Sequence, residues 1–258
     1  MNTLRFATFL SPVLYETYEY ITHYVGERLG FPATLHVAQE WEQFAEGNVD
    51  VGFICGLPYA RLSSLPSSPV ELLAAPVVQG ARYQGKPMYF SDVIVRRDSP
   101  YTSLEHLQDR VWAYNEQSSH SGYNIVQHSL LQRGKRLPFF GETLKTGSHL
   151  KSLRAVLEGR ANGTAIDSHV FDVWRLHHTG LAEQLRVIDM FGPSTIPPVV
   201  AATRLDNRLK RSIQEILVTM HLNPLAASQL QLGLIERFVL VNDEDYAEIR
   251  RIAMSVVL

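Results

Sequence analysis

Short runs of apolar residues alternate along the chain with longer segments in which apolar residues recur every three or four positions. The clearest such segment runs from Val13 to Leu29 and stops at Gly30, a residue type that commonly ends helices. The predicted strands are residues 4–10, 33–37, 50–55, 70–78, 89–96, 111–114, 163–166, 185–189, 199–203 and 238–241. The predicted helices are residues 13–29, 40–46, 104–107, 121–132, 150–157 and 168–177, with further helices in the tail from residue 207. Strands alternating with helices predict an α/β protein.

Two successive units of strands and helices predict a two-lobed protein, each lobe a mostly parallel sheet flanked by helices. We expect lobe 1 to comprise residues 1–92 plus 196–258 and lobe 2 residues 93–195, with hinge strands near 90–96 and 192–198. Ligands of open α/β sheets bind outside the carboxyl ends of the strands, where loops lead into helices. In a two-lobed arrangement these loops face one cleft. The loops concerned are residues 11–15, 56–59, 115–123 and 167–169.

The composition indicates which kinds of binding partner the chain does not favour. The 258 residues include 24 basic and 26 acidic side chains, so the net charge of -2 favours neither a nucleic acid nor an anionic membrane. The single cysteine, Cys55, rules out an intrachain disulfide. No leader precedes the first predicted strand, so we expect a periplasmic or cell-envelope protein if a leader has been removed, and otherwise a cytoplasmic one.

The turn after the predicted strand 111–114 carries the strongest chemical signal. Its hydroxyl groups, imidazole and glycine stand at the start of a helix, where free backbone N–H groups and the helix dipole favour an anion. The alternative is a serine that caps the helix beside spare polar residues. The candidate residues of this turn are Ser118, Ser119, His120, Ser121, Gly122 and Tyr123.

Two other helix starts carry candidate polar groups. His149 follows Ser148, which can cap the helix 150–157, and it either faces the ligand or is an ordinary surface histidine. Asp167 ends an apolar strand and either caps the next helix or accepts a hydrogen bond from a ligand. Aromatic residues on the same loops can wall a small pocket, although some will belong to the core. They are Tyr15, Tyr59, Tyr89, Phe90 and Tyr123.

Enzyme signatures are missing from the sequence. It has no Gly-x-Ser-x-Gly elbow, phosphate-binding Walker loop, Gly-x-Gly-x-x-Gly or His-Glu-x-x-His motif. Adjacent Ser119 and His120 cannot easily take the roles of nucleophile and base. We therefore expect a binding protein without catalysis, cofactor or metal.

Several segments, in this order and spacing, resemble a known family. They are Gly56-Leu-Pro-Tyr59, Tyr89-Phe-Ser-Asp-Val-Ile-Val-Arg-Arg-Asp-Ser99, Ser118-Ser-His-Ser-Gly-Tyr123, Gly147-Ser-His149, Ala165-Ile-Asp-Ser168, Ile196-Pro-Pro-Val-Val200 and Asp243-Glu-Asp-Tyr246. From Leu4 onward the chain resembles the phosphate/phosphite/phosphonate-binding proteins that serve ABC importers.

The resemblance implies a type II periplasmic-binding fold whose lobes close on the solute like a hinge. It implies that Ser118 to Ser121 and the following N–H groups hold a tetrahedral oxyanion. Tyr59, Tyr89, His149 and Asp167 would line the rest of the pocket, with Asp167 accepting from a ligand amine where one is present. The implied partner is the membrane permease of an ABC importer, and we expect a monomer. The family pattern has threonine where this chain has His120, which changes size and titration behaviour at the anion site.

Three functions are compatible with such a chain. The first is a receptor that delivers a small anionic solute, such as a phosphonate or phosphate, to an importer. The second is a ligand-sensing module for a signalling partner, and the third is an enzyme on the same fold. Because fold alone does not decide function, the site has to separate them.

Overall fold

The chain divides into two compact units in the computed structural model, which describes residues 3–38, 40–135 and 138–256. Unit 1 consists of the described residues through Met88 together with Thr195–Arg250, and unit 2 of Tyr89–Ser194 together with residues 251–256. The divisions expected from the sequence lie four residues later at the first boundary and one residue later at the second, and residues 251–258 were expected in lobe 1. The described part of that segment instead belongs to unit 2, because Ile252 packs into its core.

Unit 1 contains one six-stranded sheet with the strand order β11-β4-β10-β3-β1-β2. Its strands are β1 (Leu4–Thr8), β2 (Ala33–Val37), β3 (Val51–Phe53), β4 (Val70–Val78), β10 (Val199–Ala202) and β11 (Ile235–Val239). Its helices and helical turns are η1 (Pro12–Leu14), α1 (Tyr15–Leu29), α2 (Glu42–Ala45), α3 (Gly56–Ser63), η2 (Ala81–Tyr83), α8 (Asn207–Thr219), η5 (Met220–Leu222), α9 (Pro224–Leu232) and η6 (Asp243–Tyr246).

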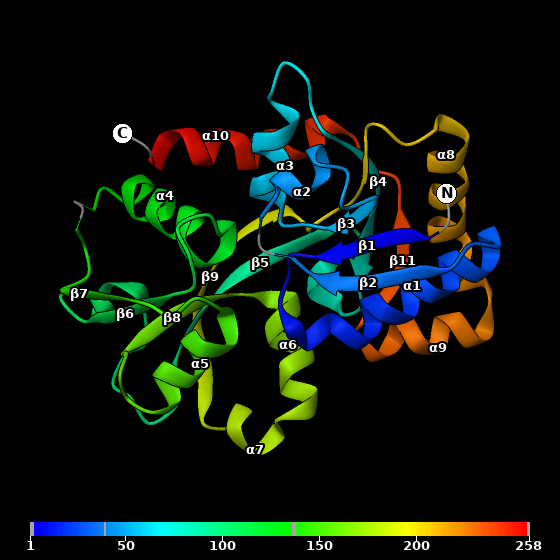
Figure 1. Ribbon diagram of the computed structural model, residues 1–258. Coiled ribbons are helices and arrows are strands. Elements are labelled where there is room, and N and C mark those ends of the chain that lie inside the picture. The colour runs from blue at the N-terminus through cyan, green and yellow to red at the C-terminus, as the bar shows by residue number, and fades with distance from the viewer. Residues whose placement is uncertain (1–2, 39, 136–137, 257–258) are drawn as a thin grey trace. The chain divides into compact units, whose positions relative to one another are not determined.

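The sheet of unit 1 is mixed rather than mostly parallel. Strand β1 pairs in parallel with β2 and β3, whereas β10 runs antiparallel to β3 and β4, and β11 antiparallel to β4. Figure 1 shows α1 running along the sheet beside β2, with α9 next to α1. Gly30 ends α1 in the left-handed conformation, with φ of 71°, as its position predicted.

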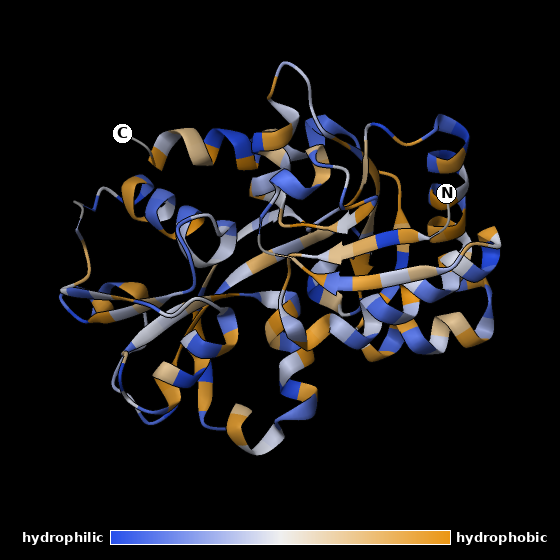
Figure 2. Cartoon of the chain, in the orientation of Figure 1, coloured by the Kyte–Doolittle hydropathy of each residue, from blue (hydrophilic) through white to orange (hydrophobic). Residues whose placement is uncertain are grey.

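The core of unit 1 is formed by apolar side chains of the strands and of one face of α1. Ile21 and Val25 of α1 are completely buried, and the ring of Tyr18 stacks on Phe53 with ring centroids 4.2 Å apart. Burying side chains of this size contributes about 1.5–3 kcal/mol each. Figure 2 shows the corresponding bands of hydrophobic and hydrophilic residues along helices such as α8.

Unit 2 contains a five-stranded sheet with the order β7-β6-β8-β5-β9. Its strands are β5 (Met88–Arg96), β6 (Val111–Tyr114), β7 (Glu142–Lys145), β8 (Gly163–Asp167) and β9 (Leu185–Thr195). Its helices and helical turns are η3 (Leu104–Leu107), the π-helical turn η4 (His120–Asn124), α4 (Ile125–Gln132), α5 (His149–Leu157), α6 (Ser168–His177) and α7 (Thr179–Ala182). The helix α10 (Ala247–Val256) begins in unit 1 and ends in unit 2.

The sheet of unit 2 is also mixed. Strand β6 runs parallel to β7 and β8, and β5 runs antiparallel to β8. Figure 1 shows β6, β7 and β8 side by side, with α5 packed against β6 and β8. In the core, the rings of Trp112 and Phe140 stack with centroids 4.4 Å apart. The carboxyl ends of β6, β7 and β8 therefore carry the loops that lead to η4, α5 and α6.

No helix in the described part of the chain is both long and apolar enough to span a membrane.

Candidate functional site

The turn between β6 and α4 is built as a helix start with open N–H groups. The hydroxyl of Ser119 accepts a hydrogen bond from the backbone N–H of Gly122 at 3.1 Å, so the expected serine cap is confirmed. Within the described residues, the backbone N–H groups of His120 and Ser121 make no hydrogen bond. Open N–H groups at the positive end of the helix dipole attract an anion.

A glycine allows this turn to fold tightly. A Cβ atom at Gly122 would lie only 1.9 Å from Oδ1 of Asn115, so a larger residue fits only if the side chain of Asn115 moves. The same Oδ1 atom is buried and has no hydrogen-bond partner among the described residues. Gly122 therefore allows the close packing of the turn against Asn115.

The start of α5 adds a second group to the turn. Nε2 of His149 lies 3.3 Å from the hydroxyl oxygen of Ser121. Ser148 caps α5 by accepting from the backbone N–H of Lys151, as expected. Burial lowers the pKa of His149 to about 4, so its imidazole is neutral at physiological pH and acts as a hydrogen-bonding group.

Asp167 stands at the start of α6. Its Oδ1 accepts from the backbone N–H groups of His169 and Val170 at 2.8 and 3.2 Å, which confirms the expected cap. Burial raises the pKa of Asp167 to about 7, although the two N–H groups oppose that shift. The carboxyl group is thus poised between its neutral and charged forms near neutral pH.

Ser91 of β5 connects the turn with Asp167. Its hydroxyl donates to the backbone carbonyl of Ser121 at 2.6 Å, and in the β5–β8 ladder Ser91 stands opposite Asp167. Ser91 lies within one of the segments that carry the family resemblance, but no sequence signal pointed to a role for it. Its neighbours in the fold, 30 and 76 positions away along the chain, are what reveal that role.

The side chain of His120 is turned into the interior of unit 2. Its side chain is completely buried, and Nε2 lies 3.0 Å from Oγ of Ser194. Burial, with a smaller contribution from His128, lowers the pKa of His120 to about 3. His120 was expected among the groups that hold the solute, which stays a prediction, whereas no sequence signal pointed to Ser194.

The expected aromatic residues divide between the units. In unit 2, Tyr89 is buried with its ring 6.4 Å from that of His120, and Tyr123 packs on Tyr114 at 5.1 Å. In unit 1, Tyr15 begins α1 and is partly buried. The hydroxyl of Tyr59 donates to Asp243 at 2.8 Å, so it is committed to a partner within unit 1.

Unit 2 therefore brings together most of the groups that the sequence singled out. Ser118 is partly buried at the beginning of the turn. Ser119, Ser121 and Gly122 form the turn. His149 contacts the hydroxyl of Ser121, and Asp167 lies opposite Ser91, whose own hydroxyl donates to the carbonyl of Ser121. The cleft expected between the lobes, with Tyr15 and Tyr59 on its other side, stays a prediction.

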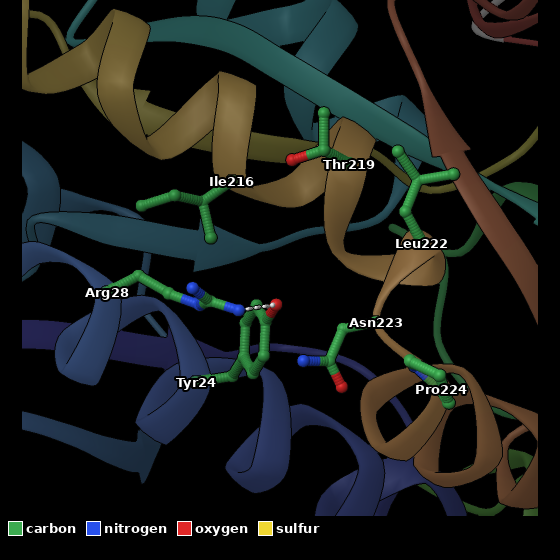
Figure 3. Close-up of a pocket in the computed structure, with 7 residues that line it drawn as sticks. All are labelled: Tyr24, Arg28, Ile216, Thr219, Leu222, Asn223 and Pro224. Atoms are coloured by element: carbon green, nitrogen blue, oxygen red, sulfur yellow. Dashed lines mark hydrogen bonds between the residues drawn. The ribbon is translucent and has the colours of Figure 1, made fainter.

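A separate hollow of about 470 Å³ lies on unit 1 between α1 and the segment from α8 to α9. Figure 3 shows the guanidinium of Arg28 directed at the hydroxyl of Tyr24, to which it donates at 3.1 Å. None of the candidate residues lines this hollow; its lining residues are Tyr24, Arg28, Ile216, Thr219, Leu222, Asn223 and Pro224. It is distinct from the turn in unit 2.

In the described ranges, no cluster of three or more histidine, cysteine, aspartate or glutamate side chains is arranged to hold a metal ion.

Solved structures with the same fold come from solute-binding proteins. A binding protein component of an ABC phosphonate transporter from Pseudomonas aeruginosa matches with a TM-score of 0.85 at 18% identity, covering 99% of this chain and 86% of that one. PhnD1 from Prochlorococcus marinus, in complex with methylphosphonate, matches with a TM-score of 0.86 at 14% identity, covering 99% and 98%. The periplasmic aliphatic sulphonate binding protein from Escherichia coli matches with a TM-score of 0.64 at 14% identity, covering 100% and 87%. These likenesses confirm the type II periplasmic-binding fold.

The family assignment comes from the sequence. A search of curated proteins finds no match. The sequence model of the family described as "ABC transporter, phosphonate, periplasmic substrate-binding protein" matches residues 6–246, nearly the whole chain. The predicted resemblance is thereby confirmed, and the chain belongs to the family of periplasmic substrate-binding proteins of phosphonate ABC transporters.

Proposed function

We propose that this chain binds one small tetrahedral oxyanion, of the phosphonate or phosphate type, at the turn of residues 118–123 in unit 2. The N–H groups of His120 and Ser121 and the hydroxyls of Ser119 and Ser121 donate to the oxyanion. His149, as a neutral imidazole, donates from Nε2 to the Ser121 hydroxyl, which leaves the hydroxyl proton of Ser121 free for the oxyanion. Asp167 accepts from an amino or hydroxyl group of the solute where one is present.

One observation carries the proposal: the helix start at η4 holds open N–H groups beside two serine hydroxyls. Its two neighbouring histidines are neutral because burial lowers their pKa values to about 3 and about 4. The turn therefore recognises charge by hydrogen bonds and the helix dipole rather than by a formal cation. Such donors are strongest toward an ionised acceptor.

The biological role follows from the family. Substrate-binding proteins of this family are components of ABC transporters, and the relative from Prochlorococcus marinus was solved with methylphosphonate. We infer that this chain delivers its solute in the periplasm to the permease of such a transporter, as a monomer and without catalysing a reaction. No contact in the described residues favours the sensing or enzymatic alternatives.

Replacing Ser119 and Ser121 together with alanine tests the site. A hydrogen bond to a charged group contributes about 1.5–3 kcal/mol, so methylphosphonate affinity is expected to fall about a hundredfold or more. Isothermal titration calorimetry measures this affinity. Because Ser119 also caps a helix, stability falls by about 1 kcal/mol.

Asp206→Ala is the matched control. Asp206 caps α8 in unit 1 by accepting from the N–H groups of Arg208 and Leu209. Its loss costs a similar cap and is expected to leave methylphosphonate affinity as it was. An affinity that stays unchanged in the double serine variant would place the site elsewhere.

A further inference from the structure

His120 occupies the centre of the anion-binding turn, yet its side chain contacts protein on the inside of unit 2. No part of the side chain is exposed, and its Nε2 atom is 3.0 Å from the hydroxyl oxygen of Ser194. Its other ring nitrogen, Nδ1, is buried without a hydrogen-bond partner among the described residues. The imidazole ring of His120 is therefore held by one hydrogen bond and by packing.

The surroundings favour a neutral ring. A protonated imidazole would bury a positive charge and a second N–H without an acceptor, which is unfavourable. Among the described residues, the polar and titratable groups that interact with the His120 ring are Ser194, Tyr89 and His128, and none of these three is an acidic residue. Burial and His128 both lower the pKa of His120, in agreement with this geometry.

The partners of His120 lie where the chain passes between the two units. Tyr89 is the first residue of unit 2 on β5, and Ser194 is its last residue on β9. The strands β5 and β9 are neighbours in the sheet of unit 2. His120 thus links the turn to both strands that leave the unit, and to β9 by a hydrogen bond.

We propose that His120 is a positioning residue, which fixes the anion-binding turn to Ser194 of β9 as a neutral imidazole and does not itself donate to the solute. This inference rests on the proposed function of the turn. A shorter side chain such as threonine does not span the distance that the His120 ring covers to Ser194 from the same backbone position. The ring therefore provides an attachment between the turn and β9 that a small hydroxyl residue would not.

Nitrogen-detected NMR of the histidine rings tests the charge state with or without solute. The expected result is that the His120 signals stay at neutral-ring values from pH 5 to 8, both alone and with saturating methylphosphonate. A direct donor to the anion would instead titrate in this range, and its pKa would rise when methylphosphonate binds. That outcome overturns the proposal.

Calorimetry with methylphosphonate tests the positioning role. Ser194→Ala removes the partner of His120 and is expected to weaken binding about fivefold, the effect of one ordinary hydrogen bond. His120→Phe should weaken it to a similar extent, and the two changes together no further, because both remove one contact. His120→Gln, which keeps a hydrogen-bonding group that can reach Ser194 and carries no charge, should restore affinity to within about twofold of the parent, less than one hydrogen bond is worth.

A second histidine–serine pair in unit 2 provides the control. Nδ1 of His128 hydrogen-bonds the hydroxyl of Ser255 at 2.8 Å, outside the turn. Ser255→Ala should leave methylphosphonate affinity unchanged. Parent-like affinity in Ser194→Ala overturns the positioning role alone, whereas a parent protein that binds neither methylphosphonate nor inorganic phosphate overturns the proposed function and this inference with it.

Discussion

Unit 1 and unit 2 each bury an aspartate, and the two carboxylates have opposite surroundings. In unit 1, Asp50 is completely buried and accepts from the guanidinium groups of Arg5 and Arg204, at 3.0 and 2.6 Å. In unit 2, Asp167 is 7% exposed and accepts from two backbone N–H groups. Among the residues that the structure describes, no arginine or lysine pairs with Asp167.

The difference appears in the pKa values. Burial alone would raise the pKa of Asp50, but the hydrogen bonds from Arg5 and Arg204 hold it below its usual value. Burial raises the pKa of Asp167 to about 7 because no cation compensates it. A buried charge that is compensated by cations stabilises the fold, whereas an uncompensated one beside a helix start is a candidate for a functional site.

Asp50→Ala is expected to have the largest effect on stability. It removes hydrogen bonds from two guanidinium groups and from the backbone N–H of Arg5. The side chains of Arg5 and Arg204 are 40% and 37% exposed, so water can solvate their positive charges after Asp50 is lost. We expect the free energy of unfolding to fall by about 3 kcal/mol, the lower end for a broken buried pair.

Urea unfolding measures the loss of stability, and hydrogen exchange shows which part of the chain is destabilised. Exchange should become faster in β1 and β3, which carry or adjoin the affected residues, and stay slow in β6 and β8. Equal acceleration in both units would show that Asp50 does not act within unit 1 alone.

Asp167→Asn should have a smaller effect of the opposite sign. The pKa of Asp167 is raised from 3.8 to about 7, so its folded form binds more protons than the unfolded chain between these values. The parent protein therefore loses stability as the pH rises from about 4 to 7, and the asparagine variant does not. Asparagine keeps the cap, with weaker hydrogen bonds than a carboxylate makes.

The variant should be more stable than the parent by about 2 kcal/mol at pH 8. The full shift, in which the cap hydrogen bonds of the carboxylate are already included, corresponds to about 4 kcal/mol, and the burial of the added amide NH2 group subtracts from it. Denaturant unfolding at pH 4, 6 and 8 tests the trend. A constant difference between variant and parent across this range would contradict the assignment of a raised pKa to Asp167.

The same contrast separates what sequence reasoning could and could not find. Strands at 33–37, 70–78 and 111–114 were predicted with the bounds observed. The apolar run 70–78 is largely buried, whereas residues 33–37 are only partly buried or exposed. The strand β7 was missed, since its residues Glu-Thr-Leu-Lys include one apolar residue and lie mostly exposed. β9 was predicted to stop at residue 189 but continues to Thr195 through Gly192 and Pro193, which usually interrupt strands.

At the candidate site, the local sequence was sufficient to predict the helix caps but not the contacts between residues far apart in the chain. Ser119, Ser148 and Asp167 cap helices that begin within three residues of them, so the sequence contains the whole interaction. The contact of His120 with Ser194 joins positions 74 residues apart. No periodic pattern encodes such a pair, and only the order of strands in the sheet brings it together.

Tyr59→Phe gives the smallest expected effect and tests whether the aromatic residue of unit 1 belongs to the site. The family resemblance placed Tyr59 in the ligand pocket, whereas its hydroxyl donates to Asp243, which also accepts from Arg250 at 2.8 Å. The ring of Tyr59 packs edge-on against Tyr246, with centroids 4.8 Å apart, and phenylalanine keeps that packing. Losing the hydroxyl should therefore cost about 1 kcal/mol of unfolding free energy, the net value of one hydrogen bond. Calorimetry with methylphosphonate should show a change in affinity of less than twofold. A tenfold loss of affinity with little change in stability would instead make the Tyr59 hydroxyl a ligand-binding group and erase this contrast between the units.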